Sequence, residues 1–121
     1  MAYDDADFGI RREQFAGEAG GAATTEYTKF RSFQAARLKK VHAAVTTAGT
    51  TTAHGVDVYH GTTSIGTIVL GTSAAGVAGH SALLDRTLAT MDQVSVKTLA
   101  DAAGKAHIVY EFEVTPDAVQ S

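Results

Sequence analysis

Apolar and polar side chains alternate over residues 107–114, and this is the clearest repeat in the chain. The two faces of the segment would be Ile108, Tyr110, Phe112 and Val114 on one side and His107, Val109, Glu111 and Glu113 on the other. A period of two is the side-chain spacing of a β-strand. Asp101–Gly104 supplies a turn before the segment, and Pro116 ends it because proline donates no ladder hydrogen bond. The pattern predicts a strand.

The middle of the chain repeats this pattern. Residues 54–60 and 64–70 are β-branched runs joined by a short glycine-containing connection, which predicts a hairpin. Gly66 inside the second run predicts a bulge or a close backbone approach. Residues 83–88 and the segment around Val94 and Val96 predict two further strands, the first with Leu84 and Leu88 inward. Residues 71–80 lack large side chains and predict a long loop.

Residues 27–47 leave two interpretations open. Val41, Ala43 and Val45 share a strand face, and Leu38 is out of phase with them, which predicts a bulge near Lys39 and Lys40. The alternative is a helix over residues 27–40, since Phe30, Phe33 and Arg37 also suit a period of 3.6.

Six to eight short strands without a convincing long helix predict an all-β fold. We expect a single β-sandwich or jelly-roll-like barrel over residues 26–121, because 121 residues are too few for two stable cores. The hydrophobic fraction is 45%, but 22 of those residues are alanine, which indicates a thin core. The residues expected to be buried are Val56, Val58, Ile68, Val96, Ile108, Tyr110 and Phe112.

Residues 1–25 predict an extended N-terminal arm outside the core. They are rich in glycine and acidic residues and have no sustained period, yet they contain the aromatic residues Tyr3, Phe8 and Phe15. Disordered segments are poor in aromatic rings. We therefore expect an arm that becomes ordered on a partner surface; the alternatives are a floppy terminus or a short helix over residues 10–18.

The net charge of −3 is unevenly distributed. Residues 26–40 hold five basic side chains against one acidic one, whereas residues 41–121 hold three against seven. The five form a predicted basic collar: Lys29, Arg31, Arg37, Lys39 and Lys40. Such a collar can steer docking onto an acidic partner, or it can be a solvated strand edge that discourages aggregation. Tyr27, Phe30 and Phe33 interleave with it as in some nucleic-acid-binding surfaces, but the acids beyond residue 40 argue against nucleic acid.

The sequence contains no catalytic or cofactor-binding motif. There is no cysteine, which excludes disulfides, thiol catalysis and cysteine-ligated metals. The five histidines are scattered, although His42 could meet His107 across strands and His54 shares a face with His60. A triad of Ser64, His60 and Asp57 lacks a nucleophile elbow, and the pair Glu111 and Glu113 is typical of a solvated strand face. We expect no enzyme activity, no metal and no cofactor.

The N-terminal sequence and the hydropathy bear on where the protein is made. Residues 2–7 are acidic and lack the apolar run of a signal peptide. No apolar stretch approaches the roughly 20 residues that a membrane helix requires. We expect synthesis in a cytoplasm and no membrane insertion.

Residues 54–114 carry a resemblance. The hairpin sequence of residues 55–72 and the later segments of residues 91–99 and 102–106 resemble paired strands of phage structural β-sandwiches, and the Ala/Thr/Gly-rich composition without Cys or Trp is similar too. In particular, the chain resembles the head decoration proteins, also called cement or auxiliary capsid proteins, of tailed bacteriophages.

This resemblance implies a virion structural protein on the outside of the capsid. Such proteins commonly form trimers and use an N-terminal arm to tie subunits of the major capsid protein together. Here the arm would be residues 1–25, next to the basic collar. The alternatives are a tail or head-completion protein and a carbohydrate-binding β-sandwich, for which Tyr27, Tyr59 and Tyr110 would be the platforms.

Overall fold

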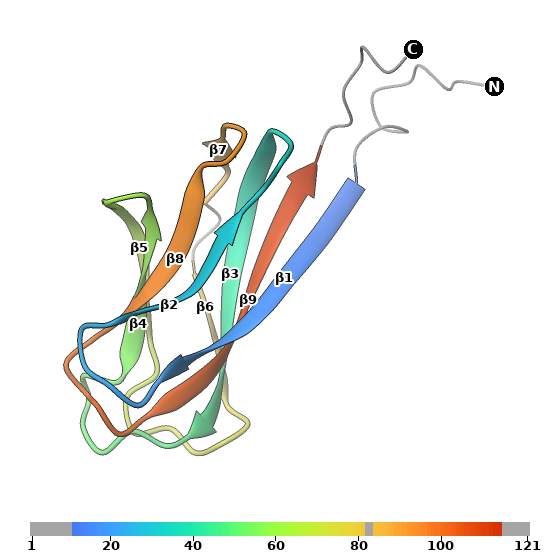
Figure 1. Ribbon diagram of the computed structural model, residues 1–121. Helices are drawn as coiled ribbons and strands as arrows, with labels where there is room; N and C mark the ends of the chain where they lie inside the picture. The colour runs from blue at the N-terminus through green and yellow to red at the C-terminus, as the bar shows by residue number, and fades with distance from the viewer. Residues whose placement is uncertain (1–10, 82–83, 115–121) are drawn as a thin grey trace, which may run out of the picture.

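The protein is an all-β sandwich, seen here in a computed structural model that describes residues 11–81 and 84–114 (Figure 1). No helix forms in these ranges, so none that could cross a membrane is present in them. The strands are β1 (Arg11–Gly20), β2 (Glu26–Arg31), β3 (Ala36–Thr47), β4 (Gly55–His60), β5 (Thr63–Val69), β6 (Ala78–His80), β7 (Arg86–Leu88), β8 (Gln93–Thr98) and β9 (Lys105–Val114).

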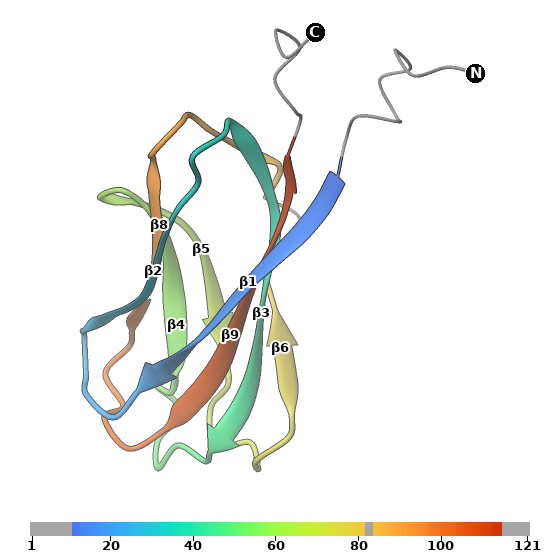
Figure 2. The same ribbon diagram turned by 45° about the vertical axis from the view of Figure 1, so that its right-hand side comes forward.

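Two antiparallel sheets face each other (Figure 2). The five-stranded sheet has the order β1-β9-β3-β6, with β7 pairing the other end of β3. The four-stranded sheet has the order β2-β8-β4-β5. β9, the most regular strand of the sequence, lies between β1 and β3 and pairs with both of them over nearly its whole length. The predicted β-sandwich is therefore confirmed.

The hairpin and both predicted bulges are present. β4 pairs with β5 from Gly55 opposite Val69 to His60 opposite Thr63, and its register shifts where Ile65, next to Gly66, has no partner. In β3 the register shifts between Leu38 and Lys40. That shift lets Leu38 and Val41 both face the core, which a regular strand would forbid. Residues 27–40 hold strands β2 and β3, so the helix alternative is wrong.

Residues 71–88 differ in part from the prediction. The expected loop over residues 71–80 ends in a short strand, because β6 pairs with β3. The strand expected over residues 83–88 is limited to β7. Leu88 is buried and Leu84 packs against the core as expected, while Leu83 lies outside the described residues.

The predicted boundary between arm and domain at residue 25 is wrong for residues 11–25. β1 pairs with β9 at every position from Arg11 opposite Val114 to Gly20 opposite Lys105, and Figure 1 shows the two strands side by side. Ala19 is buried, and Phe15 stacks on Tyr110 with 6.3 Å between ring centroids. The short helix considered for residues 10–18 is likewise replaced by this strand over residues 11–18. β1 is an edge strand of the sandwich.

The core lies between the sheets and contains all seven residues expected to be buried. The largest is Tyr110, whose hydroxyl donates a hydrogen bond to the Thr28 carbonyl at 2.7 Å. Burial raises the pKa of the Tyr110 hydroxyl above its ordinary value. The remaining buried apolar residues include many valines and alanines, consistent with the thin core that the composition indicates.

Asp101 organises the loop that joins β8 of one sheet to β9 of the other. Its carboxylate is buried and accepts hydrogen bonds from the backbone amides of Thr50, Thr51, Ala103 and Gly104, at 2.7–3.1 Å. These hydrogen bonds, that of the Gly104 amide above all, stabilise the ionised carboxylate. They therefore hold the pKa of Asp101 well below its usual range. This one side chain therefore ties the β3–β4 loop to the β8–β9 loop.

Candidate binding surfaces

A bulge in β2 closes one side of the sandwich. The register shifts between Tyr27 and Phe30, and Thr28 adopts a φ of 55°. In this position the Thr28 hydroxyl donates to the Glu18 carbonyl of β1 at 2.9 Å, while the Thr28 carbonyl accepts from Tyr110 of β9. The bulge thus links the edge strands of the two sheets, β1 and β2, which otherwise belong to separate hydrogen-bond ladders.

Beside this link lies the aromatic groove, a hollow of about 540 Å³ between the ends of β1, β2 and β9. Phe30 contacts Phe15 and Phe112, with ring centroids 4.8 and 4.9 Å apart. Phe33, at the rim, exposes 83% of its surface and Phe15 exposes 37%. The residues that line the groove are Glu13, Phe30, Arg31, Ser32, Phe33, Gln34, Phe112 and Val114. An exposed ring beside an open apolar hollow is typical of a protein-interaction surface.

Of the aromatic residues predicted to bind a partner, Phe15 is the one within the described residues; it does not line the groove but contacts Phe30, which does. Tyr3 and Phe8 lie outside the described residues. Sequence reasoning considered Phe30 and Phe33 only as possible helix or base-stacking residues. The contact of Phe30 with Phe15 depends on the pairing of β1 with β9, which the sequence did not predict.

The predicted basic collar is not one patch. Lys29 is exposed in the β2 bulge, and Arg31 of β2 donates to the Met91 carbonyl and to the Gln93 side chain, at 2.7 and 3.0 Å. Arg37, Lys39 and Lys40 belong to β3 in the other sheet, where acidic side chains lie close to them. The collar residues thus divide between the two sheets.

Ion pairs cross the outer face of the five-stranded sheet. Lys39 lies 2.8 Å from Asp85 and 3.9 Å from Glu113. Arg12 of β1 lies 3.0 Å from Glu113 and 3.5 Å from Glu111. Hydrogen bonding by Lys39 is the largest of the effects that lower the pKa of Asp85 below its ordinary value. Arg37 also lies 3.4 Å from Asp85. We call this set of ion pairs the charge network. In it, Arg37 and Lys39 are paired with acidic side chains of the same protein.

The histidines form pairs other than the predicted ones. His42 meets His80 rather than His107, with their Nδ1 atoms 2.7 Å apart, and its Nε2 lies 3.6 Å from Glu111. His54 was expected to share a strand face with His60, but it precedes β4, which begins at Gly55; it is buried, and its Nδ1 has no hydrogen-bond partner in the described structure.

The triad drawn from the sequence does not assemble. His60 Nε2 bonds Asp92 at 2.8 Å, whereas Asp57 accepts a hydrogen bond from Thr67. Arg86 donates to His60 Nδ1 at 3.1 Å, so His60 must donate to Asp92 through Nε2. This hydrogen bond lowers the pKa of Asp92. Residues 11–81 and 84–114 contain no group of three His, Asp or Glu side chains that could hold a metal.

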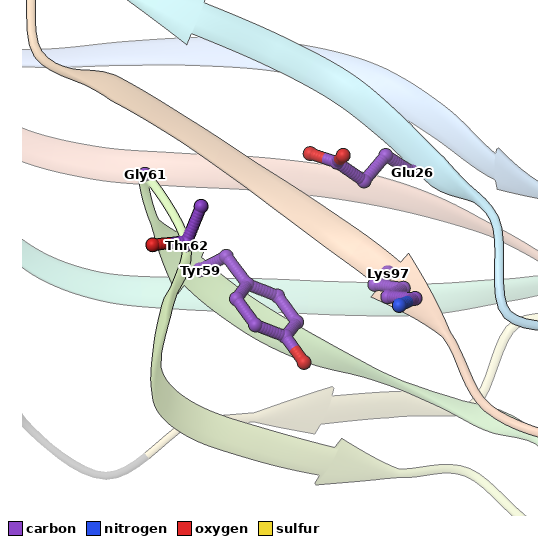
Figure 3. A pocket seen from close by; sticks show the side chains of 5 residues that line it. All are labelled: Glu26, Tyr59, Gly61, Thr62 and Lys97. Carbon is purple, nitrogen blue, oxygen red and sulfur yellow. The ribbon is translucent and has the colours of Figure 1, made fainter.

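The outer face of the four-stranded sheet contains the Tyr59 pocket, a hollow of about 270 Å³. Glu26, Tyr59 and Lys97 come from β2, β4 and β8, and Gly61 and Thr62 from the turn after β4. Figure 3 shows Tyr59 between this turn and Lys97, with Glu26 facing them from β2. Of the three tyrosines considered as ligand platforms, Tyr110 is buried and Tyr27 packs against the core, so only Tyr59 can serve.

Comparisons with known proteins identify an architecture and no family. No protein-family model and no curated protein matches the sequence. The solved structure of the cyanophage Pam1 capsid asymmetric unit contains a similar chain, with a TM-score of 0.52 and 12% identity over 88% of this chain and 85% of that one. At that identity the likeness shows a shared β-sandwich fold.

Two other similar structures have TM-scores below 0.5. Bacillus endospore appendages, described as disulfide-linked pili, give 0.49 with 18% identity over 89% of each chain. A carbohydrate-binding module in complex with calcium and xylotriose gives 0.43 with 18% identity over 88% of this chain and 99% of that one. These similarities are too weak to extend the assignment beyond the sandwich architecture.

Proposed function

We propose that this protein is a virion structural protein, namely a decoration protein that binds the outside of a phage head and stabilises it by bridging major capsid subunits. The observation that carries the proposal is the aromatic groove, where Phe33 and Phe15 are exposed beside a hollow at the sandwich edge. The Pam1 likeness is consistent with it, since two chains of nearly equal length share the fold and one of them comes from a capsid.

The groove suits an extended segment of a capsid subunit. β1 is an edge strand. Its side away from β9 has no further strand of the described sheet beside it, and Thr28 of β2 bonds only the Glu18 carbonyl near the end of β1. An incoming strand could extend the sheet there while its apolar side chains enter the groove, which is the mode called β-augmentation. Backbone pairing would supply affinity, and the phenylalanine rings would supply specificity.

The charged residues fit a secondary role in this proposal. Lys29 is exposed in β2, next in sequence to the groove residue Phe30, whereas Arg37 and Lys39 are held by Asp85. Lys29 therefore has more freedom than Arg37 and Lys39 to approach an acidic capsid surface. A homotrimer would present three grooves and would multiply weak contacts.

The experiment uses undecorated heads of the phage that encodes the protein. Recombinant protein is mixed with heads, and occupancy is measured by co-sedimentation and electron microscopy over a dilution series. Phe33→Ser should lower occupancy steeply while leaving the free energy of unfolding within about 0.5 kcal/mol, because the ring is exposed. Val69→Ser is the matched control, since Val69 is 66% exposed on β5, at the far edge of the other sheet.

Wild-type occupancy by the Phe33→Ser protein would show that the groove is not the docking surface. Absence of the wild-type protein from particles, and failure to bind them, would contradict the decoration function itself. Light scattering of the free protein tests the trimer, and a monomer at all concentrations would remove that part of the proposal.

A further inference from the structure

The Tyr59 pocket is surrounded by hydrogen-bonding groups that the protein does not use. Within the described residues, the Tyr59 hydroxyl, the Thr62 hydroxyl and the Lys97 ammonium make no hydrogen bond or ion pair. Exposed donors of this kind are solvated in the free protein and are available to a ligand. The Tyr59 pocket differs from other parts of the described surface because three such groups line the same hollow.

The walls of the pocket are held in position by their own contacts. Ser95, opposite Tyr59 in the register, donates to one Glu26 carboxylate oxygen at 2.8 Å and leaves the other free. The Gly61 amide donates to the Gln93 carbonyl at 2.8 Å, which fixes the turn that carries Thr62. A preorganised site loses less conformational entropy on binding.

The chemistry of the walls restricts the ligand. One carboxylate and one ammonium nearly cancel, so a strongly charged ligand gains little. The ligand must donate to Glu26, accept from Lys97 and present an apolar face to the Tyr59 ring, whose body is apolar and whose tip is polar. A pyranose ring has hydroxyls that both donate and accept, together with a face of C–H groups.

The size of the hollow agrees with this ligand class. Its volume of about 270 Å³ lies just below the range of roughly 300–1,000 Å³ typical of small-molecule sites. One sugar ring is therefore a suitable occupant, with neighbouring rings of an oligosaccharide extending over the open sheet face.

We propose that the Tyr59 pocket is a binding site for a neutral oligosaccharide. Tyr59 stacks on one sugar ring, the free Glu26 oxygen accepts hydrogen bonds from its hydroxyls, and Lys97 and Thr62 donate to the remaining ones. The site is independent of the aromatic groove, which lies at the β1–β2 edge. It therefore does not depend on the capsid proposal.

The test is a nuclear magnetic resonance titration of the full ¹⁵N-labelled chain. The probes are cellotriose, maltotriose and chitotriose, each added to about 10 mM, where a site with a millimolar dissociation constant is mostly occupied. We expect at least one probe to give saturable amide shifts centred on Gly61, Thr62 and Ser95. A tyrosine-containing tripeptide is titrated in parallel to represent a peptide ligand.

Variants assign the binding to the pocket. Tyr59→Ala should raise the dissociation constant at least about tenfold, and Tyr59→Phe should retain most of the binding because it keeps the ring. If Tyr59→Ala does not fold, Lys97→Gln replaces it and should weaken binding at least about threefold. Arg12→Gln, on the opposite sheet, is the matched control and should bind as the wild type does.

Three outcomes of the titrations with wild-type protein overturn the proposal. They are no saturable shift with any of the three trisaccharides, shifts that centre on another surface, and binding of the tripeptide at these amides without binding of any sugar. Unchanged affinity in both Tyr59→Ala and Lys97→Gln would also overturn it.

Discussion

The outer faces of the two sheets both carry charged side chains, but they use them differently. On the five-stranded sheet, the charge network links β1, β9, β3 and the residue before β7 through Arg12, Glu113, Lys39 and Asp85. On the four-stranded sheet, Glu26, Lys97 and Asp57 lie opposite one another in the register, yet no ion pair joins them in the described structure.

The difference separates charges that the fold uses from charges that it leaves for other molecules. A paired side chain must give up its intramolecular contact before it can bind a ligand, whereas an unpaired one gives up only water. The charge pattern of the sequence pointed to Arg37 and Lys39, among other basic residues, as partner-binding residues. Their ion pairs with Asp85 leave them less available to a ligand than Lys97, which has no ion pair among the described residues.

The largest loss of stability is expected from a change in the core beneath the five-stranded sheet, not from a change on the outer face of that sheet. Phe112→Ala should lower the free energy of unfolding by about 3–5 kcal/mol, because the ring is 4% exposed and its removal leaves a cavity. Chemical denaturation measures this loss. A loss below about 1 kcal/mol would mean that the charge network, and not the core under it, holds this sheet together.

The next effect is expected at Asp101, which joins the loops of the two sheets. Because the folded-state pKa of Asp101 is lowered, its contribution is present above the unfolded pKa of about 3.9 and is lost as the pH falls through the folded value. The melting temperature of Asp101→Asn should therefore be clearly below that of the wild type at pH 6, with the gap narrowing below about pH 4. A gap independent of pH would show that the carboxylate charge is not what the four amides require.

A smaller effect is expected within the charge network. Arg12→Gln removes the contacts to Glu111 and Glu113, and surface pairs of this kind contribute at most about 1 kcal/mol. The loss should shrink at high salt, where such pairs are screened. Denaturation midpoints at low and high ionic strength measure it. A loss that did not change with salt would point to packing of the Arg12 stem instead.

The smallest effect is expected from the matched change on the other face. Lys97→Gln also removes one positive charge, but no ion pair is lost among the described residues, so the free energy of unfolding should stay within about 0.5 kcal/mol. The same denaturation assay compares the two variants directly. If Lys97→Gln cost as much as Arg12→Gln, the proposed contrast between the faces would fail.

The sequence predicted the strands whose side chains alternate. It missed the short strand β6, which lies in the predicted loop, and the long strand β1, whose inward face has few large apolar residues. β9 places large apolar residues inward at every second position, so its face was evident. The inward positions of β1 opposite that face are Glu13, Phe15, Gly17 and Ala19, of which only Phe15 is a large apolar residue. β1 is positioned by pairing with β9, about one hundred residues away in sequence, and local pattern cannot report such a partner.

The candidate sites were less predictable than the fold for the same reason. Tyr59, Lys97 and Glu26 meet because β4, β8 and β2 are neighbours in a sheet, and their register sets which side chains face each other. Tyr59 was singled out from the sequence as a ligand platform, but nothing in the sequence paired it with Glu26 and Lys97. The aromatic groove depends on the same kind of long-range pairing.

The position of β9 has a consequence for biosynthesis. The strand lies between β1 and β3, yet it is made after both of them. During translation, β1 and β3 each wait with an unpaired edge until residues 105–114 leave the ribosome. Folding of the five-stranded sheet is thus expected to be slow, as for other topologies dominated by non-local pairing. A chain released before residue 105 would expose both edges to aggregation.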